Sequence, residues 1–378
     1  MGEQGYEAVE MTGNGFETPL TRALGCRYPV VQTAMGWVAD PKLVAATTNA
    51  GGFGFLAAAS IPPGGIDAAI AAVKAATDGP FGINFHMFQP NAEEVIEAIL
   101  LHRVRAVSYG RGPDAATIAR FRDAGIECMP TVGAVKHAVR AVALGASIIT
   151  VQGGEGGGHT GSVPTSLLLP QVLDAVDVPV VAAGGFYDGR GLAAALAWGA
   201  DGIAMGTRFL LTSESPVHPE TLARYLTTAD PAAIRVSKAV DGLPQRFIDN
   251  EELRRMEGMS RPARFLASLR HGLSWGRAQG MSYASMLRLA LRALKAGDAG
   301  FAATVMAPNL PRLVEQGLVS GDTRGGLLPS GQVAALIGEL ESCDALITRI
   351  VREAEERLSA LRQLPGRDCE TATQGAWA

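Results

Sequence analysis

The residues best suited to chemistry lie in one glycine-rich loop, residues 151–161. Six of its eleven residues are glycine, and its titratable side chains are one carboxylate, Glu155, and one imidazole, His159. Glycines let a backbone adopt positive φ and approach a ligand closely. Histidine, with an unperturbed pKa of about 6.5, can take or give a proton near neutral pH. We therefore expect a loop built around a bound molecule, with His159 as its catalytic acid or base.

The other side chains around this loop are expected to support the bound molecule. Glu155 is expected to orient the loop by accepting backbone N–H bonds, with direct catalysis as the alternative. His86, which follows the third strand, is expected to have a packing or rim role, with a position pointing into the mouth of the barrel as the alternative. The loop residues expected to contact a cofactor are Gln152, Gly157 and Gly158.

The elements that position this loop alternate between strands and helices from residue 28 to about 210. Eight short apolar or β-branched runs are typical of strands, at residues 29–33, 52–57, 81–85, 104–108, 126–131, 147–151, 178–183 and 202–205. Ala-rich amphipathic segments lie between them. This alternation predicts an α/β fold, a (β/α)8 TIM barrel whose strands are covered by helices. A doubly wound open sheet is the alternative architecture.

Glycine turns follow the last two predicted strands. Gly184 and Gly185 end the seventh strand, and Gly206 and Thr207 end the eighth. In a TIM barrel the loops after these strands commonly bind phosphate, and backbone N–H groups and a hydroxyl are suitable donors. We expect a phosphate group between these two turns.

A flat ring fits the ends of two earlier strands. Asn84, at the end of the third strand, has an amide that can donate and accept along the edge of a heterocycle. The residues where a ring could lie on the backbone follow the first strand and are Gln32, Thr33, Ala34 and Met35. A planar ring with a phosphate tail indicates FMN as the cofactor.

The strand–helix alternation stops after the eighth strand. The segment 228–328 contains helix-like stretches at 263–279 and 282–295 but no clear strands, so we expect a mainly helical insertion that serves as a substrate or lid domain. A last helix at 332–364 is expected to return to the barrel. The expected organisation is a flexible tail at 1–18, a barrel formed by 19–227 and 329–364, the insertion at 228–328, and a flexible tail at 365–378.

The insertion contains a basic stretch inside an acidic protein. From Glu251 to Ala296 there are nine Lys and Arg residues against three Glu, so nine minus three gives a local charge of +6. One interpretation is ordinary solvated helix faces. The other is a patch for an anionic substrate such as a phosphorylated carrier, with Arg254 and Arg255 as its first candidates.

Composition excludes several classes of protein. The chain has 378 residues, 47% of them hydrophobic, and a net charge of −4, which argues against a nucleic-acid partner. Its four cysteines are far apart and show no metal-binding spacing, so we expect reduced thiols and no metal site. We find no signal peptide and no long apolar run, and therefore expect a cytoplasmic protein with no membrane partner.

On its motifs the chain resembles the nitronate monooxygenase family, formerly called 2-nitropropane dioxygenases. The weaker marks are Pro29-Val30-Val31-Gln32 through Met35-Gly36, Asn49-Ala50-Gly51-Gly52 and Gly82-Ile83-Asn84. The stronger marks are the Glu-x-Gly-Gly-His-x-Gly pattern at 155–161, and the run from Ala183 through Asp188-Gly189-Arg190-Gly191 to Met205-Gly206-Thr207-Arg208-Phe209. Gly156 stands where the family often has Ala, which leaves the pocket's shape open.

This resemblance implies a TIM barrel with tightly but non-covalently bound FMN and with His159 as the catalytic residue. Ser330 and Gly331 match a small-residue loop that closes over the flavin in such enzymes. The implied flavin contacts are Gln32 to Met35, Asn84, Lys136, Gly184, Gly185, Gly206 and Thr207.

Three functions fit these expectations. The first is oxidation of a nitronate or small carbon acid through flavin N5, with His159 as acid or base. The alternative is an FMN-dependent dehydrogenase or enoyl reductase acting on a CoA or acyl-carrier thioester, such as a ring intermediate of steroid breakdown. A third is a barrel that binds a phosphorylated ligand without redox chemistry. O2 or NAD(P)H is the expected co-substrate, and a homodimer is a possible assembly.

Overall fold

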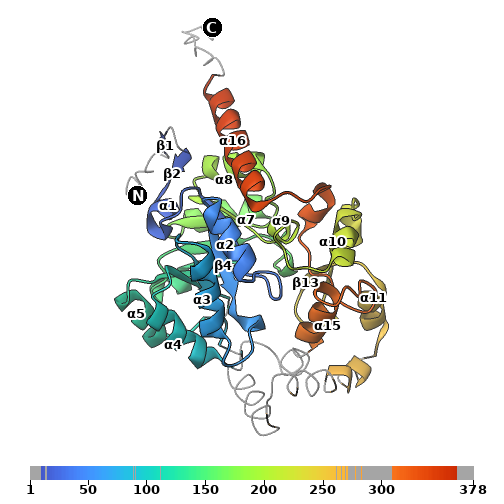
Figure 1. The fold of residues 1–378 in the computed structure, drawn as a ribbon. Helices are drawn as coiled ribbons and strands as arrows, with labels where there is room; N and C mark the ends of the chain where they lie inside the picture. Colours follow the sequence, from blue (N-terminus) through green and yellow to red (C-terminus); the bar gives the residue numbers. More distant parts are fainter. Residues whose placement is uncertain are drawn as a thin grey trace, which may run out of the picture.

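The structure is a computed structural model, shown as a ribbon in Figure 1. It describes residues 10–12, 15–87, 89, 91–110, 112–260, 262–264, 266–268, 270, 277, 282 and 309–363. The expected C-terminal tail at 365–378 and most of the helix-like stretches at 263–279 and 282–295 lie outside these residues.

Eight parallel strands close into a barrel, which confirms the predicted (β/α)8 TIM-barrel fold. The strands are β3 (Val30–Gln32), β4 (Phe53–Ala57), β5 (Gly82–Asn84), β6 (Ala106–Tyr109), β7 (Glu127–Val132), β8 (Ile149–Gln152), β10 (Val180–Ala183) and β11 (Gly202–Met205). Each pairs with its neighbour in chain order, and β11 pairs with β3 to complete the ring. Every residue of β4, β6, β10 and β11 is buried. Strands covered on both faces therefore appear in the sequence as continuous apolar runs.

Helices surround the barrel, and several begin at an aspartate. Asp40, Asp114 and Asp188 each accept a backbone N–H of the first turn of α2, α5 and α8, as N-cap residues do. The helices of the barrel region are α2 (Pro41–Asn49), α3 (Ile66–Ala76), α4 (Ala92–His102), α5 (Ala115–Asp123), α6 (Val135–Ala143), α7 (Thr165–Leu173), α8 (Gly189–Ala197) and α9 (Thr207–Leu210), with a 3-10 turn η1 (Ala58–Ser60) after β4.

The last helix returns to the barrel but is shorter than expected. Instead of one helix over 332–364, a 3-10 turn η3 (Gln332–Leu336) is followed by α16 (Cys343–Arg362). The break lies where Glu341 forms a β-bridge with Thr212 and accepts the N–H of Ser213, so the backbone is extended there. Ser342 then caps α16, which packs on α8 and α2 in the position of the missing eighth helix, since α9 is a single turn (Figure 1).

A short N-terminal unit covers the opposite end of the barrel from the strands' carboxyl ends. The strands β1 (Glu10–Thr12) and β2 (Gly15–Glu17) form a hairpin, followed by α1 (Pro19–Leu24). The Thr18 hydroxyl donates to the carbonyl of Asp201, just before β11, and Leu20 is fully buried. Part of the segment 1–18 that we expected to be a tail thus packs on the barrel through the buried side chain of Phe16.

The insertion after the eighth strand contains a small sheet that we did not expect. Strands β12 (Ile234–Ser237) and β13 (Gln245–Ile248) form an antiparallel hairpin, and β13 also pairs with β9 (Gly158–His159) of the glycine-rich loop. The hairpin was missed because its strands are four residues long and β13 buries the polar Gln245 and Arg246. Around it lie α10 (Pro219–Leu226), η2 (Pro231–Ala233), α11 (Glu251–Gly258) and α15 (Asn309–Leu318), grouped on one side of the barrel (Figure 1).

No helix within the described residues is long and apolar enough to cross a bilayer.

Candidate active site

The carboxyl ends of the barrel strands bring most of the predicted site residues to one rim. Gln32 is the last residue of β3 and is in register with Met205, the last residue of β11. Asn84, at the end of β5, pairs with Ser108, and Gln152, at the end of β8, pairs with Ala183. In a TIM barrel this face carries the active site.

The two glycine turns follow β10 and β11 at the same rim. Gly184 and Gly185 have φ of +92° and +90°, a conformation that side-chain-bearing residues rarely adopt. A Cβ on Gly206 would lie 3.1 Å from the hydroxyl of Thr33 and 3.4 Å from the sulfur of Met35. The turn after β11 therefore lies close to the residues that follow β3, as a shared ligand site requires.

The small-residue loop at 330–331 closes against the same turn. The Gly331 N–H donates to the hydroxyl of Thr207 (2.9 Å). A Cβ on Gly157 would lie 2.6 Å from the Gly331 nitrogen, so the two backbones touch. Ser330 is fully buried, and its N–H donates to the carbonyl of Arg246 (3.1 Å). Residues far apart in the sequence thus meet at this point.

Two side-chain amides lie at the ends of β3 and β5, which flank β4 in the barrel. The Gln32 Nε2 donates to the carbonyl of Phe55 (3.2 Å), while its Oε1 is buried and has no protein partner among the described residues. The Asn84 Nδ2 donates to the backbone and side-chain oxygens of Ser108 (3.1 and 2.8 Å). An orphaned buried acceptor beside a glycine-lined rim fits a heterocyclic ligand with N–H groups on its edge.

His159 lies in β9, at the edge of the small sheet. Its side chain is 51% exposed, and its Nε2 is 2.7 Å from the Oδ2 of Asp241, whose side chain is 6% exposed. The carbonyl of His159 accepts the Nε2–H of Gln152 (2.8 Å). One imidazole nitrogen therefore contacts a buried carboxylate, and the ring remains accessible.

Asp241 belongs to the β12–β13 connection of the insertion, and sequence reasoning missed it. Burial would raise the pKa of this carboxyl, but the hydrogen bond and charge of His159, together with hydrogen bonds from the Leu243 N–H and the Gln245 side chain, hold the pKa below its usual value. The Leu243 N–H also donates to its Oδ1 (3.0 Å). Its position in the Asp-Gly turn at 241–242 gave no local sign of a site, because its partner is 82 residues away.

His86 faces the same site from the loop after β5. Burial, together with the charge of the nearby His159, lowers the pKa of His86 to about 4. At neutral pH His86 is therefore uncharged, and it can hydrogen-bond to a ligand or a neighbour without competing for the proton of His159.

Glu155 and Arg246 hold the glycine-rich loop in place. Glu155 accepts the N–H and the hydroxyl of Thr165 (3.0 and 2.8 Å), at the start of α7. The buried guanidinium of Arg246 donates to the carbonyl of Gly154 (2.6 Å). The geometry of Glu155 matches the orienting role expected for it, rather than contact with a substrate.

Lys136 and the basic residues Arg254 and Arg255 are less closely connected to the rim. Lys136 is exposed in the first turn of α6, and the structure records no side-chain bond for it among the described residues. Arg254 is paired with Asp249 (2.7 Å), and Arg255 with Glu252 at hydrogen-bonding distance. These two arginines are thus already neutralised by carboxylates.

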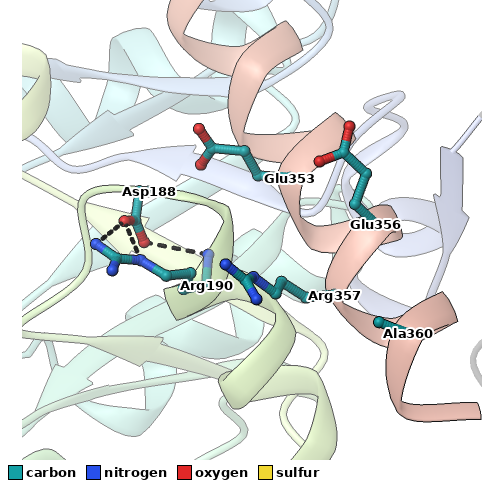
Figure 2. Close-up of a pocket in the computed structure, with 6 residues that line it drawn as sticks. All are labelled: Asp188, Arg190, Glu353, Glu356, Arg357 and Ala360. Atoms are coloured by element: carbon teal, nitrogen blue, oxygen red, sulfur yellow. Dashed lines mark hydrogen bonds and ion pairs between the residues drawn. The ribbon is translucent and has the colours of Figure 1, made fainter. Parts of the chain in front are cut away.

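A separate hollow of about 430 Å³ lies outside the barrel, between the start of α8 and α16 (Figure 2). Asp188 and Arg190 pair on the α8 side of this hollow, and none of the predicted site residues lines it. Within the described part of the chain, no group of three or more His, Cys, Asp or Glu side chains could hold a metal ion.

Comparison with protein families agrees with the motifs of this rim. The family model described as nitronate monooxygenase matches residues 17–98 and 91–353. The chain belongs to the nitronate monooxygenase family. As a member it is an oxidoreductase.

Individual relatives differ in the names they carry. Two proteins named (3aS,4S,5R,7aS)-5-hydroxy-7a-methyl-1-oxo-octahydro-1H-indene-4-carboxyl-CoA dehydrogenase, from Mycobacterium tuberculosis and Rhodococcus jostii, are 46% and 45% identical to this chain, over 92% of it and 99% of each relative. The solved structure of FabK from Thermotoga maritima is 28% identical, with a TM-score of 0.73, and covers 92% of this chain and 98% of that one.

Proposed function

We propose that this protein is an FMN-dependent dehydrogenase that oxidises a CoA thioester, with His159 as the acid or base. The observation that carries the proposal is the accessible imidazole of His159, held by Asp241 at the rim where the flavin residues meet. Support for the substrate class comes from the two carboxyl-CoA dehydrogenases, which are similar over almost their whole length. This favours the second of the functions expected from sequence over the first.

The residues of the rim fit a flavin mononucleotide. The turns at Gly184–Gly185 and Gly206–Thr207 offer backbone N–H groups for the phosphate. The backbone after Gln32 offers small residues for the ring, and Asn84 and the orphaned oxygen of Gln32 offer polar contacts to its edge. The loop at 330–331 covers Thr207 and Gly157. When bound, FMN would supply an acceptor for the two electrons of the oxidation.

The protein's own residues would handle the proton. Dehydrogenation removes two electrons and two protons from adjacent atoms of the substrate, and a carbon beside a thioester carbonyl loses its proton as an acid. His159 is placed to take that proton, since its ring is exposed at the rim and its Nε2 is already occupied by Asp241. The fixed loop around it, tied by Glu155 and Arg246, limits the positions the ring can adopt.

The insertion offers one candidate place for the phosphates of CoA. A cleft of about 270 Å³ is lined by Arg224, Arg254 and Arg324, and also by Asp249 and Glu251, which pair with Arg254 and Arg324. The guanidinium of Arg224 donates to a backbone carbonyl and to the hydroxyl of Thr228, so no carboxylate neutralises it among these contacts. Strand β13 leads there from the partner of His159, and four residues at about 3.3 Å each give roughly 13 Å, a distance that an extended pantetheine arm can span.

Oxidation of a nitronate is the second candidate, favoured by the family that the chain belongs to. A nitronate is already an anion and needs no base, so His159 would then hold its negative nitro group. The two functions differ in their use of O2, because a monooxygenase turns over with O2 alone and a dehydrogenase accepts another electron acceptor.

The test is product analysis with purified enzyme. A bicyclic carboxyl-CoA thioester and an artificial electron acceptor should give a product lighter by two hydrogens, whereas the free acid plus CoA should not react. Turnover of nitronates with O2, and none of any thioester with any acceptor, would replace this proposal with the second candidate.

A further inference from the structure

The insertion contributes a residue, Asp241, that contacts the imidazole of His159. Its hairpin pairs with the catalytic loop, with His159 opposite Gln245 and Gly158 opposite Arg246. Just beyond, the Thr160 N–H donates to the carbonyl of Pro244 (3.1 Å). The insertion therefore holds the backbone on both sides of His159, while Gln152, at the end of β8, donates to the His159 carbonyl from the barrel.

The carboxylate of Asp241 has little freedom to leave the imidazole. Its Oδ2 contacts the His159 Nε2 at 2.7 Å, and its Oδ1 accepts the Leu243 N–H at 3.0 Å. Both oxygens are occupied, and the side chain is almost fully buried, whereas the imidazole is half exposed. The contact with Asp241 therefore holds the imidazole on its buried side, while the other side of the ring remains accessible to a ligand.

The charge of Asp241 determines which nitrogen of His159 carries a hydrogen. Asp241 stays ionised at neutral pH because the bond and charge of His159, with the hydrogen bonds of Leu243 and Gln245, together outweigh its burial and lower its pKa. An ionised carboxylate only accepts hydrogen bonds, so the nitrogen that faces it must carry a hydrogen. That hydrogen stays on Nε2 whether the ring is neutral or charged.

We propose that Asp241 is a positioning residue that fixes the Nε2–H tautomer of His159 and so makes Nδ1 the nitrogen that exchanges a proton with the substrate. The proton leaves the substrate carbon for Nδ1, and the electron pair of the broken C–H bond stays with the substrate. The arrangement is similar to that in enzymes in which a buried carboxylate orients a catalytic histidine. The exchange with a thioester rests on the proposed function, whereas the tautomer does not.

Other charged groups surround the ring but do not take this role. His86, after β5, is uncharged near neutrality because its pKa is about 4. Glu155, in the same loop, is bonded to Thr165, and Arg246, on β13, is bonded to the carbonyl of Gly154. Asp241 is the charged group in direct contact with the imidazole among the described residues.

The test compares Asp241→Asn with Asp241→Glu, and uses Asp230→Asn as the matched control. Asp230 is an exposed residue of the insertion whose side chain caps η2, so the control makes the same change away from His159. An asparagine can present either its oxygen or its amide hydrogens, and the tautomer is then no longer fixed. We expect Asp241→Asn to lower kcat by about 10²-fold or more, in the range of acid–base effects, with partial rescue by Asp241→Glu.

Two measurements separate this role from simple support of the fold. Nitrogen-15 NMR of labelled histidine should show the hydrogen of His159 on Nε2 in the wild type and a mixed population in Asp241→Asn, with or without flavin bound. Loss of the negative charge should also move the acidic limb of the kcat/KM profile to lower pH. The Asp230→Asn protein should match the wild type in both measurements.

The outcomes distinguish the two proposals. A wild-type hydrogen on Nδ1, or an Asp241→Asn protein with unchanged tautomer and pH profile, would overturn the role of Asp241. The expected tautomer together with no turnover of any thioester would leave that role intact and would count against the proposed substrate alone.

Discussion

The rim of the barrel and the insertion beside it differ in how their residues come together. At the rim, Gln32 and Asn84 end β3 and β5, and Gly206 follows β11, so the closed barrel alone brings these residues to the same end. In the insertion, Asp241 reaches His159 through a hairpin that pairs with the glycine-rich loop. The first region contains the residues proposed to hold the cofactor, and the second contributes the carboxylate proposed to orient His159.

The largest expected effect is a loss of kcat on replacement of His159, the residue at which the rim and the insertion meet. His159→Ala should lower kcat with a neutral thioester by about 10²–10⁴-fold, the usual contribution of a general acid or base, and should leave flavin content unchanged. A preformed nitronate anion should lose less, because it needs no base. The control is His102→Ala, which removes an outer-surface histidine paired with Asp67. Equal loss in both variants, or unchanged turnover in His159→Ala, would remove His159 from the mechanism.

The next largest expected effect is a loss of bound flavin, and it concerns the rim alone. Gly185→Asp should strip most of the flavin, because a side chain is strained at φ +90° and its carboxylate would repel the phosphate. Gly125→Asp is the control for strain, since Gly125 has φ +74°, lies in open space and follows α5 at the opposite end of the barrel. Absorbance spectra of the purified proteins give the flavin content. Stoichiometric flavin in Gly185→Asp would place the phosphate elsewhere.

The smallest expected effect is a rise in KM for acyl-CoA, and it concerns the insertion alone. Arg224→Gln should raise KM for acyl-CoA about tenfold, the value of one hydrogen bond to a charged group, and the difference should shrink at high salt. Arg352→Gln, on the exposed face of α16, is the control. If KM stays at the wild-type value across salt concentrations, the arginine cleft is not the phosphate site.

The barrel and its rim are the features that could be predicted from the sequence. The strands of the barrel were recognisable because burial on both faces makes β4 or β10 a continuous apolar run. The glycine turns were recognisable because positive φ at Gly184 and Gly185 requires glycine. Both signals are local, and they were sufficient to predict the fold and most of the rim.

The remaining features depend on contacts between distant segments. Strand β13 hides Gln245 and Arg246 inside a sheet, so its pattern is not that of a typical strand. Asp241 and His159 are 82 residues apart, and nothing near Asp241 in the chain indicates its partner. The expected helix at 332–364 is interrupted because Glu341 pairs with Thr212. Such pairings become visible only when the chain is folded.

The most direct test of the proposed function is anaerobic mixing of the purified protein with a bicyclic carboxyl-CoA thioester, followed by visible absorbance. We predict a yellow protein whose oxidised-flavin absorbance band decreases when the thioester is added. In His159→Ala this decrease should be at least about 10²-fold slower. A colourless protein that takes up no FMN, or a flavin that thioesters leave oxidised while nitronates reduce it, would contradict the proposed function.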